Sequence, residues 1–498
     1  MNRKTFLKSI LGLSITSLLP FSVSAKKGEQ ENLKDKLNLL FITADDLDFS
    51  IPGFMGGMKG LTPHLDSLAS RSHVFTHNRT VAAICMPSRQ ALMSGLVPHR
   101  NGGEGFIPMK KGTQTLASVL KKEGWYTAAI HKIDHMQPVS SFPWDFAISG
   151  ADRNTAIHSE GFKVALKEAQ AQSRPFFINC NINDPHRPFY GSPGGLKMDH
   201  GNVGVFSIIS KEVTPDDVTI PPNLEDLPDI RKEIAQYWNS AQRMDIAIGN
   251  ILQALEESGE ADRTVIIFCA DHGMPFPFAK ATCYEHGTRV PVLISLPGME
   301  RSERHANLTT HVDVMPTALA LLGVQSPEDL DGRSWLPIME KKAVKEPEFI
   351  FTYINQTASG MAYPVRAVHD SRYTLVFSPW SDGKLKLKVD GMLGMTFAAM
   401  EKAAREDTRI AQRIKQLTDG VLLAFYDLQT DPGQRHNLIE VPEHQAMIEK
   451  MKQALLQEMK RTTDPQLDNF IKSLAGEKPV VIQDPKRYRL KTGQSYYF

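Results

Sequence analysis

The chain has 498 residues, enough for one large domain with a full hydrophobic core and a smaller second domain. Its composition, with 41% hydrophobic and 23% charged residues, is that of a water-soluble folded protein. The formal net charge of +1 argues against a nucleic-acid binder, so an anionic ligand would have to meet a local cluster of cations.

Residues 1–25 have the pattern of an export signal. Arg3 and Lys4 form a basic start, residues 10–23 are mostly apolar, and the small residues at 23–25 suit cleavage. The apolar run is short for a membrane span, although an uncleaved anchor is the alternative. We expect export to a bacterial periplasm or beyond, without stable membrane insertion.

Short apolar runs then alternate with helical patterns, which is typical of a parallel sheet covered by helices. The expected strands are residues 39–43, 127–130, 175–179, 264–268 and 292–294. The expected helices are residues 62–69, 115–123 and 234–257. The sequence therefore predicts an α/β fold with a large, mixed but mainly parallel sheet between helices.

A charged stretch near residues 339–347 marks a domain boundary. Beyond it we expect the strands 349–353 and 373–377 and the helices 401–417 and 444–461. The predicted organisation is an export signal at 1–25, a large domain at 26–345 and a C-terminal α+β subdomain with a small antiparallel sheet at 346–498.

Acidic pairs follow two of the expected strands. Asp45-Asp46 comes after residues 39–43, and Asp271-His272 comes after residues 264–268. Alone, each pair would more often be a solvated loop, but ligands of open α/β sheets bind beyond the carboxyl ends of strands. Three carboxylates and a histidine around one point need a cation, and oxygen ligands suit Ca²⁺ or Mg²⁺.

Cationic side chains also follow the expected strands and could bind an anion. Arg89 lies four residues after Cys85, where the first turn of a helix would add backbone N–H groups. The others are Lys132, His135, His186 and Lys280. Each by itself would more commonly be a solvated surface residue; their shared placement at strand ends indicates an anion site.

The four cysteines are Cys85, Cys180, Cys269 and Cys283. Cys180 and Cys269 each end an apolar run and read as core residues, so we expect no structural disulfide. Cys85 differs because it opens Cys85-Met86-Pro87-Ser88-Arg89, followed by a segment that ends at Gly95.

This run resembles the signature of the type I sulfatases of the alkaline phosphatase superfamily. Further blocks are similar to that family, and they are residues 38–46, 62–69, 268–273, 285–291 and 426–438. The resemblance covers nearly all of the chain beyond residue 25 and implies the alkaline phosphatase-like fold.

The resemblance also implies a mechanism. Cys85 would be oxidised to formylglycine by a separate maturation enzyme, and the hydrated aldehyde would attack the sulfate. The implied ligands of one Ca²⁺ ion, with Mg²⁺ less suited, are Asp45, Asp46, residue 85, Asp271 and His272. The implied catalytic residues are Cys85, Arg89, Lys132, His135, His186 and Lys280.

Within the family the chain is most similar to the sulfamidase (heparan N-sulfatase) branch. The matching segments are residues 99–102, 184–187, 275–277, 363–366 and 463–465. This implies a sulfated saccharide substrate, with N-sulfoglucosamine of heparin or heparan sulfate fragments as the leading candidate. The expected substrate-binding residues are His99, Asp184, Arg187 and Arg366.

Three departures keep other substrates open. Lys280 stands where that branch carries arginine, while the Asp271-His272 pair and the spacing of Lys132 and His135 are similar to iduronate-2-sulfatase. An O-sulfatase acting on a glycosaminoglycan or an algal polysaccharide is therefore the alternative. Minor alternatives are a phosphoester hydrolase of the same superfamily and an inactive binder of sulfated glycans.

Overall fold

The computed structural model describes residues 36–150, 153–195, 209, 211–481 and 483. The export signal expected at residues 1–25 lies outside this part of the chain. Among the described helices, none is both long and apolar enough to cross a membrane.

Eight strands form the large sheet, in the spatial order β4-β3-β5-β1-β6-β7-β2-β8. Their bounds are β1 Asn38–Asp45, β2 His73–Arg79, β3 Tyr126–Ile130, β4 Phe146–Ile148, β5 Phe176–Pro185, β6 Thr264–Ala270, β7 Val292–Ser295 and β8 Glu303–Thr310. All neighbours are parallel except β7, which runs antiparallel to both β6 and β2. The sheet is mixed and mainly parallel, as the sequence predicts.

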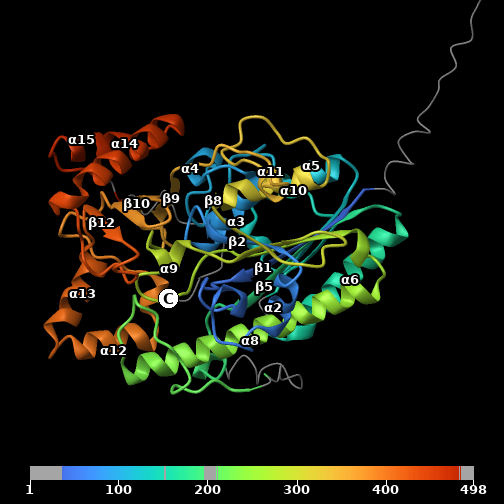
Figure 1. Cartoon of the computed structure of the whole chain (residues 1–498), viewed down its shortest axis with the longest axis horizontal. Coiled ribbons are helices and arrows are strands. Elements are labelled where there is room, and N and C mark those ends of the chain that lie inside the picture. The colour runs from blue at the N-terminus through green and yellow to red at the C-terminus, as the bar shows by residue number, and fades with distance from the viewer. Residues whose placement is uncertain (1–35, 151–152, 196–208, 210, 482, 484–498) are drawn as a thin grey trace, which may run out of the picture.

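Helices cover both faces of this sheet (Figure 1). On one face lie α2 (Pro63–Ala69), α6 (Thr155–Ala171) and α8 (Pro228–Glu257). On the other lie α3 (Cys85–Ser94), α5 (Leu116–Lys122), α10 (Val314–Leu321) and α11 (Leu336–Met339). The short helices α4 (Pro98–Asn101) and α9 (Glu285–Thr288) lie in connecting segments.

The central strand β1 shows why the sheet is buried on both faces. All of its residues are buried, with Leu40 and Ile42 in the core beneath α8 and Leu39 and Phe41 in the core beneath α5 and α10. Successive side chains of a strand point to opposite faces, so a continuous apolar run fills both layers.

The smaller sheet is antiparallel, in the order β12-β11-β10-β9. Its strands are β9 Ile350–Gln356, β10 Ala362–His369, β11 Tyr373–Phe377 and β12 Leu423–Asp427. Its helices are α12 Met395–Ala403, α13 Thr408–Asp419, α14 Gln445–Arg461 and α15 Leu467–Leu474, at the left of Figure 1. The boundary predicted at residue 346 falls between the end of α11 and the start of β9.

Two expected elements differ from those observed. The helix predicted at residues 401–417 is two helices, because Asp407 caps a new one by accepting a hydrogen bond from the Arg409 amide at 2.8 Å. The strand predicted at residues 175–179 continues as β5 to Pro185. His186 therefore follows a strand directly, without the short loop that we expected.

Candidate active site

The strands β3, β5, β1 and β6 are neighbours and parallel, so their carboxyl ends meet at one edge of the sheet. The predicted site residues follow these ends: Lys132 and His135 after β3, His186 after β5, Asp45 and Asp46 at β1, and Asp271 and His272 after β6. We call this group, with Cys85, Arg89 and Lys280, the strand-end cluster.

Asp271 organises the backbone of the strand-end cluster. Its Oδ1 accepts hydrogen bonds from the amides of Asp46 at 3.0 Å and His272 at 2.9 Å. Its Oδ2 accepts one from Arg89 Nε at 3.0 Å. One fully buried carboxylate thereby fixes the two acidic loops and the helix α3 relative to one another.

Arg89 is held from three sides. Its Nη1 donates to Thr43 Oγ1 at 2.8 Å and to Asn181 Oδ1 at 2.7 Å. Burial alone would lower its pKa, but Asp271 and Asp45 raise it, so Arg89 stays a cation. Its Nη2 is buried, donates no hydrogen bond within the described residues and lies 3.7 Å from Asp45 Oδ1.

Cys85 is the first residue of α3 and is buried. Its Sγ lies 3.2 Å from His272 Nε2. Burial and the nearby Asp45 carboxylate raise the pKa of the Cys85 thiol well above its ordinary value. An unmodified thiol would thus stay protonated, and a protonated thiol is a poor nucleophile.

The carboxylates offer a site for a hard cation. Both Asp45 oxygens are buried and accept no hydrogen bond within the described residues. His272 donates from Nδ1 to the Gly273 carbonyl at 3.0 Å, and its Nε2 lies 3.2 Å from Asp46 Oδ1. One ligand atom from each of Asp45, Cys85, Asp271 and His272 lies within 4.8 Å of all the others. The close approach of these four side chains, three of them oxygen or nitrogen donors, fits a bound metal ion.

Lysines balance the charges of Asp45, the last residue of β1, and of Asp46, which follows it. Burial would raise the pKa of Asp45, but Lys132, with Arg89 and Lys280, holds it well below its ordinary value. The Lys132 ammonium forms an ion pair with Asp45.

Asp46 behaves differently. Burial raises its pKa to about 6 despite Lys280 and His272, with Asp45 and Asp271 adding to the rise. Lys280 Nζ donates to both Asp46 oxygens, at 2.9 and 3.1 Å.

The sequence did not point to Asp390, which is a second partner of Lys280. Asp390 Oδ2 lies 3.0 Å from Lys280 Nζ and comes from a one-turn helix at Asp390–Met392, beyond β11. Burial would lower the pKa of Lys280, but Asp390 and Asp46 hold it well above its ordinary value. A lone aspartate far along the chain carries no pattern that sequence analysis could use.

Two histidines complete the cation-rich side. His186 Nδ1 donates to the Arg187 carbonyl at 2.5 Å, and its Nε2 lies 3.9 Å from Asp46 Oδ2. His135 Nδ1 has no hydrogen-bond partner among the described residues. Burial, with Lys280 for His186 and Lys132 for His135, lowers the pKa of both imidazoles well below the ordinary value.

The strand-end cluster opens into a cavity of about 570 Å³. Cys85, Asp46, Lys132, His135, His186 and Lys280 line its floor. Its walls include Arg187, Glu233 of α8 and the segment from Leu393 to Met395 of the C-terminal part. The Arg187 guanidinium forms an ion pair with Glu233 in this wall.

The other three predicted substrate-binding residues lie outside this lining. Asp184 accepts from Arg243 at 2.7 and 2.9 Å, and Arg366 donates to Asp464 at 2.5 and 2.8 Å. His99 is buried edge-on against Tyr353. In the free protein these three side chains therefore contact the protein itself.

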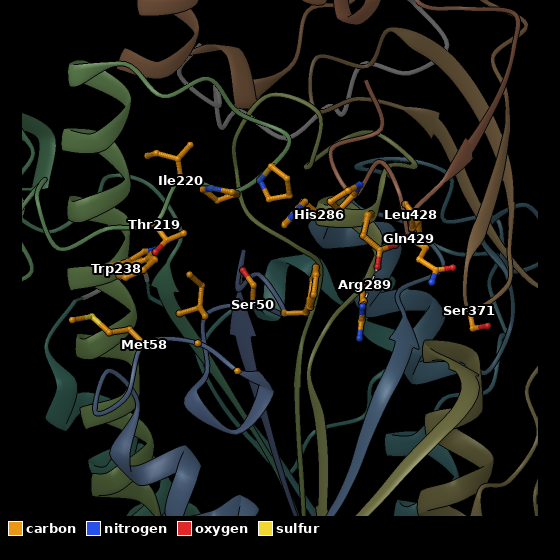
Figure 2. Close-up of a pocket in the computed structure, with 18 of the residues that line it drawn as sticks. Ser50, Met58, Thr219, Ile220, Trp238, His286, Arg289, Ser371, Leu428 and Gln429 are labelled. Carbon is orange, nitrogen blue, oxygen red and sulfur yellow. Dashed lines mark hydrogen bonds and ion pairs between the residues drawn. The ribbon is translucent and has the colours of Figure 1, made fainter. Parts of the chain in front are cut away.

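A second cavity, of about 730 Å³, lies between the loop after β1, α8 and the C-terminal part (Figure 2). It contains no predicted site residue, and its charged groups already have partners. His286 Nδ1 lies 2.9 Å from Asp48 Oδ2, while Arg289 donates to the Thr76 carbonyl and stacks on Phe49 at 4.4 Å. The cavity at the strand-end cluster is thus the candidate active site.

Comparisons with known proteins identify the family of the chain. The sequence profile of the family described as Sulfatase matches residues 37–324, and the profile described as N-sulphoglucosamine sulphohydrolase, C-terminal, matches residues 271–382. Human N-sulphoglucosamine sulphohydrolase is 29% identical over 467 residues, covering 86% of this chain and 91% of that protein. An ulvan-active sulfatase of Formosa agariphila is 26% identical over 450 residues, covering 88% of this chain and 83% of that protein.

Solved structures show the same fold at low identity. A complex described with its substrate D-glucosamine-2-N,6-O-disulfate superposes with a TM-score of 0.65 at 17% identity, covering 87% of this chain and 99% of the other. A phosphonate monoester hydrolase from Silicibacter pomeroyi superposes with a TM-score of 0.61 at 17% identity, covering 87% and 97%. The fold is therefore shared by a protein whose substrate is a sulfated glucosamine and by a phosphonate monoester hydrolase.

Proposed function

The chain belongs to the sulfatase family and hydrolyses sulfuric esters or sulfamates, and from that premise we propose that it removes sulfate from a sulfated glycan, with N-sulfoglucosamine as the sugar attacked. The observation that carries the proposal is the convergence of Arg89, Lys132 and Lys280 with three buried carboxylates on Cys85. Fixed cations beside a fixed metal site suit the transfer of an anionic group.

The proposed metal ion is Ca²⁺, held by Asp45, Asp46, Asp271 and His272 together with residue 85. Their donor atoms are mainly carboxylate oxygens, which favour a hard ion. When bound, the ion supplies a Lewis acid that polarises sulfate oxygens.

The proposal assigns residue 85 as formylglycine, made from Cys85 by a maturation enzyme. The run Cys85-Met86-Pro87-Ser88-Arg89 and the burial of Cys85 at the start of α3, beside the proposed metal ligands, support this assignment. One hydroxyl of the hydrated aldehyde would attack sulfur while the bond from sulfur to the sugar nitrogen or oxygen breaks. Loss of the proton of the second hydroxyl would then break the carbon–oxygen bond to sulfate, which releases sulfate and restores the aldehyde.

The chain's own side chains then orient the reactants. Arg89 Nη2, which has no hydrogen-bond partner among the described residues, is the donor assigned to hold residue 85, together with Lys132. Lys280 Nζ and His186 Nε2 face the same Asp46 carboxylate and are assigned to hold the sulfate oxygens. His186 is also the proposed proton donor to the leaving atom, with His135 assisting.

To donate a proton to the leaving atom, the His186 imidazole must first be protonated. Burial and Lys280 keep its imidazole neutral in the free protein. A bound sulfate would place negative charge beside Nε2 and raise the pKa of His186, because an opposite charge within a few ångströms favours the cationic form.

The N-sulfated sugar is proposed from the comparisons. The human relative is named for N-sulphoglucosamine, and the glucosamine disulfate belongs to a solved structure of the same fold. The proposal includes export, on the composition of residues 1–25. An O-sulfated polysaccharide is the second candidate, favoured by the ulvan-active relatives of Formosa agariphila.

The test is sulfate release by the matured enzyme from glucosamine carrying sulfate at N, O6 or O3, beside a 2-O-sulfated uronic acid. Mass spectrometry of the peptide that contains residue 85 reports the conversion of Cys85. The Cys85→Ala variant is the control, and we expect it to fold normally and to lose more than about a thousandfold in turnover.

The outcomes separate the two levels of the proposal. Release from the N-sulfated sugar alone supports the full assignment, and release from an O-sulfated sugar moves the substrate to the second candidate. Full sulfate release by Cys85→Ala would overturn the assigned nucleophile.

A further inference from the structure

Three metal-ligating side chains lie together on β2 and β8, outside the strand-end cluster: His73, Glu303 and His305. The two strands are parallel neighbours, with His73 opposite Glu303 and Phe75 opposite His305. Residues two apart on a strand point to the same face, so Glu303 and His305 both lie beside His73. Strand register alone therefore assembles the group, which we call the strand-start cluster.

The spacing of the strand-start cluster suits a small metal ion. His73 Nδ1 lies 2.9 Å from His305 Nε2, and one ligand atom of each of the three residues lies within 4.8 Å of the others. Two nitrogens at about 2.0–2.1 Å from a tetrahedral zinc ion stand about 3.4 Å apart. The two rings would need to separate by only about half an ångström to accept one.

The surroundings hold these ligands in place. The His305 ring stacks on Phe75 with centroids 4.9 Å apart, and Phe75 packs against Trp335 at 4.6 Å.

Among the described residues, Glu303 forms an ion pair with Lys341. Lys341 Nζ lies 3.1 Å from Glu303 Oε1, and the lysine side chain is 73% exposed. A flexible, exposed ammonium is easily displaced from a carboxylate, because such pairs contribute little to stability.

We propose that the strand-start cluster is a second metal site, which takes one divalent transition-metal ion, Zn²⁺ or a similar borderline cation. Two imidazole nitrogens and one carboxylate oxygen form a ligand set that zinc uses, with the fourth position left to water. Ca²⁺ is excluded by the same set, because it prefers six to eight oxygen ligands. The bound ion would join the edge strand β8 to β2.

The site lies at the opposite edge of the sheet from the strand-end cluster. Because β7 runs antiparallel to both neighbours, β2 and β8 run in the same direction as β1 and β6. His73 and Glu303 are the first residues of their strands, whereas Asp45 is the last residue of β1. A change at one edge can therefore be tested without touching the other.

The experiment is a titration of the full-length, Ca²⁺-saturated protein with Zn²⁺ by isothermal calorimetry, repeated with Co²⁺ and followed by visible absorption. The variants are His305→Gln and Glu303→Gln. His436→Gln is the matched control. His436 is 79% exposed and lies 3.5 Å from the Asp431 carboxylate, but among the described residues it belongs to none of the groups that could hold a metal ion. Any Zn²⁺ that binds at the strand-end cluster is common to all of these proteins.

We expect the wild type and His436→Gln to bind one Zn²⁺ more than His305→Gln does. Glu303→Gln should weaken that site by about tenfold or more and should keep the histidine pair intact. Zn²⁺ should raise the melting temperature of the wild type and of His436→Gln, in which the site is intact, but not that of His305→Gln. Sulfate release should be unchanged in both variants.

Equal Zn²⁺ stoichiometry and affinity in all four proteins would overturn the proposal and leave the two rings as a hydrogen-bonded pair that only ties the strands. If His305→Gln fails to fold, Glu303→Gln decides, because it removes a charge and no volume. Unchanged Zn²⁺ affinity in Glu303→Gln would then reject the site.

Discussion

The two edges of the large sheet each gather metal-ligating side chains, but they do so by different means. At the carboxyl ends, the ends of β1 and β6 bring three carboxylates and a histidine to Cys85 at the start of α3, and all five side chains are buried. At the amino ends, two histidines and one glutamate meet through the register of β2 and β8; His73 is buried, and Glu303 and His305 stay partly accessible.

The difference lies in the counter-charges. In the strand-end cluster, Arg89, Lys132 and Lys280 lie against the acidic residues, so the protein holds opposite charges at short range. Such an arrangement costs desolvation free energy that burial of apolar groups elsewhere must offset. The strand-start cluster has one exposed lysine instead. The first arrangement suits the transfer of an anionic group, and the second suits holding an ion.

The strand β8 runs from the strand-start cluster toward the strand-end cluster. Glu303 is its first residue, His305 is its third, and His311 follows its last residue. His311 is buried against α3, the helix that begins at Cys85, and its Nδ1 lies 3.3 Å from Ser88 Oγ. The predictions below change residues at both edges and compare the effects.

The largest effect should follow from Asp45→Asn. The amide keeps the volume of the side chain but removes the charge that balances Lys132 and Arg89 and that a cation needs. We expect loss of Ca²⁺ measured by elemental analysis and a fall in turnover of roughly a thousandfold. The circular dichroism spectrum should be unchanged.

Glu303→Gln is the matched change at the other edge. It should keep Ca²⁺ and sulfate release and lose only Zn²⁺ affinity. Loss of Ca²⁺ from both variants alike would mean that the two clusters are not independent.

A smaller effect should follow from changes to Lys280. Lys280→Ala leaves Asp46 and Asp390 without their shared cation, and we expect turnover to fall about a hundredfold. Lys280→Arg keeps the charge and should stay within about tenfold of wild type. Steady-state kinetics on the sugar that the enzyme accepts would measure both.

Asp390→Asn tests whether the C-terminal part of the cavity lining affects substrate binding or the chemical step. Asp390 contacts Lys280, which is assigned to bind the sulfate. Its loss should therefore raise KM by about tenfold and lower kcat less. An equal loss of kcat would instead show that the C-terminal part positions Lys280 for the chemical step.

The fold and the acidic residues could be predicted from local sequence. Continuous apolar runs such as residues 39–43 mark strands buried on both faces, and strand ends in a parallel sheet share one edge. Asp45, Asp46, Asp271 and His272 therefore had to lie close together. The resemblance to the sulfatase signature added what periodicity does not contain, namely the role of Cys85.

The supporting residues were missed for a physical reason. Thr43 and Asn181 hold Arg89 from inside β1 and β5, and polar side chains within strands are also found where no site exists. Alternating asparagines at 179, 181 and 183 were the available signal for a longer β5. The Lys280–Asp390 contact joins residues 110 positions apart, which no local pattern encodes.

The smallest effect concerns pH and the two ends of β8. Burial, with His272 and Arg89, lowers the pKa of His311 from 6.5 to about 3. The unfolded chain takes up a proton below pH 6.5 and the folded protein does not, so this stability is present above pH 6.5 and is lost as the pH falls. By pH 5 the loss from this residue amounts to about 2 kcal/mol.

In His311→Gln the free energy of unfolding, measured by urea denaturation, should therefore fall less steeply between pH 6.5 and pH 5, even if it starts lower at pH 8. His305→Gln at the other end of β8 should change the slope less, because that imidazole is only partly buried and its pKa is lowered less completely. Parallel pH profiles for wild type and His311→Gln would show that His311 already carries a proton in the folded protein, and that the helix bearing Cys85 packs against a charge.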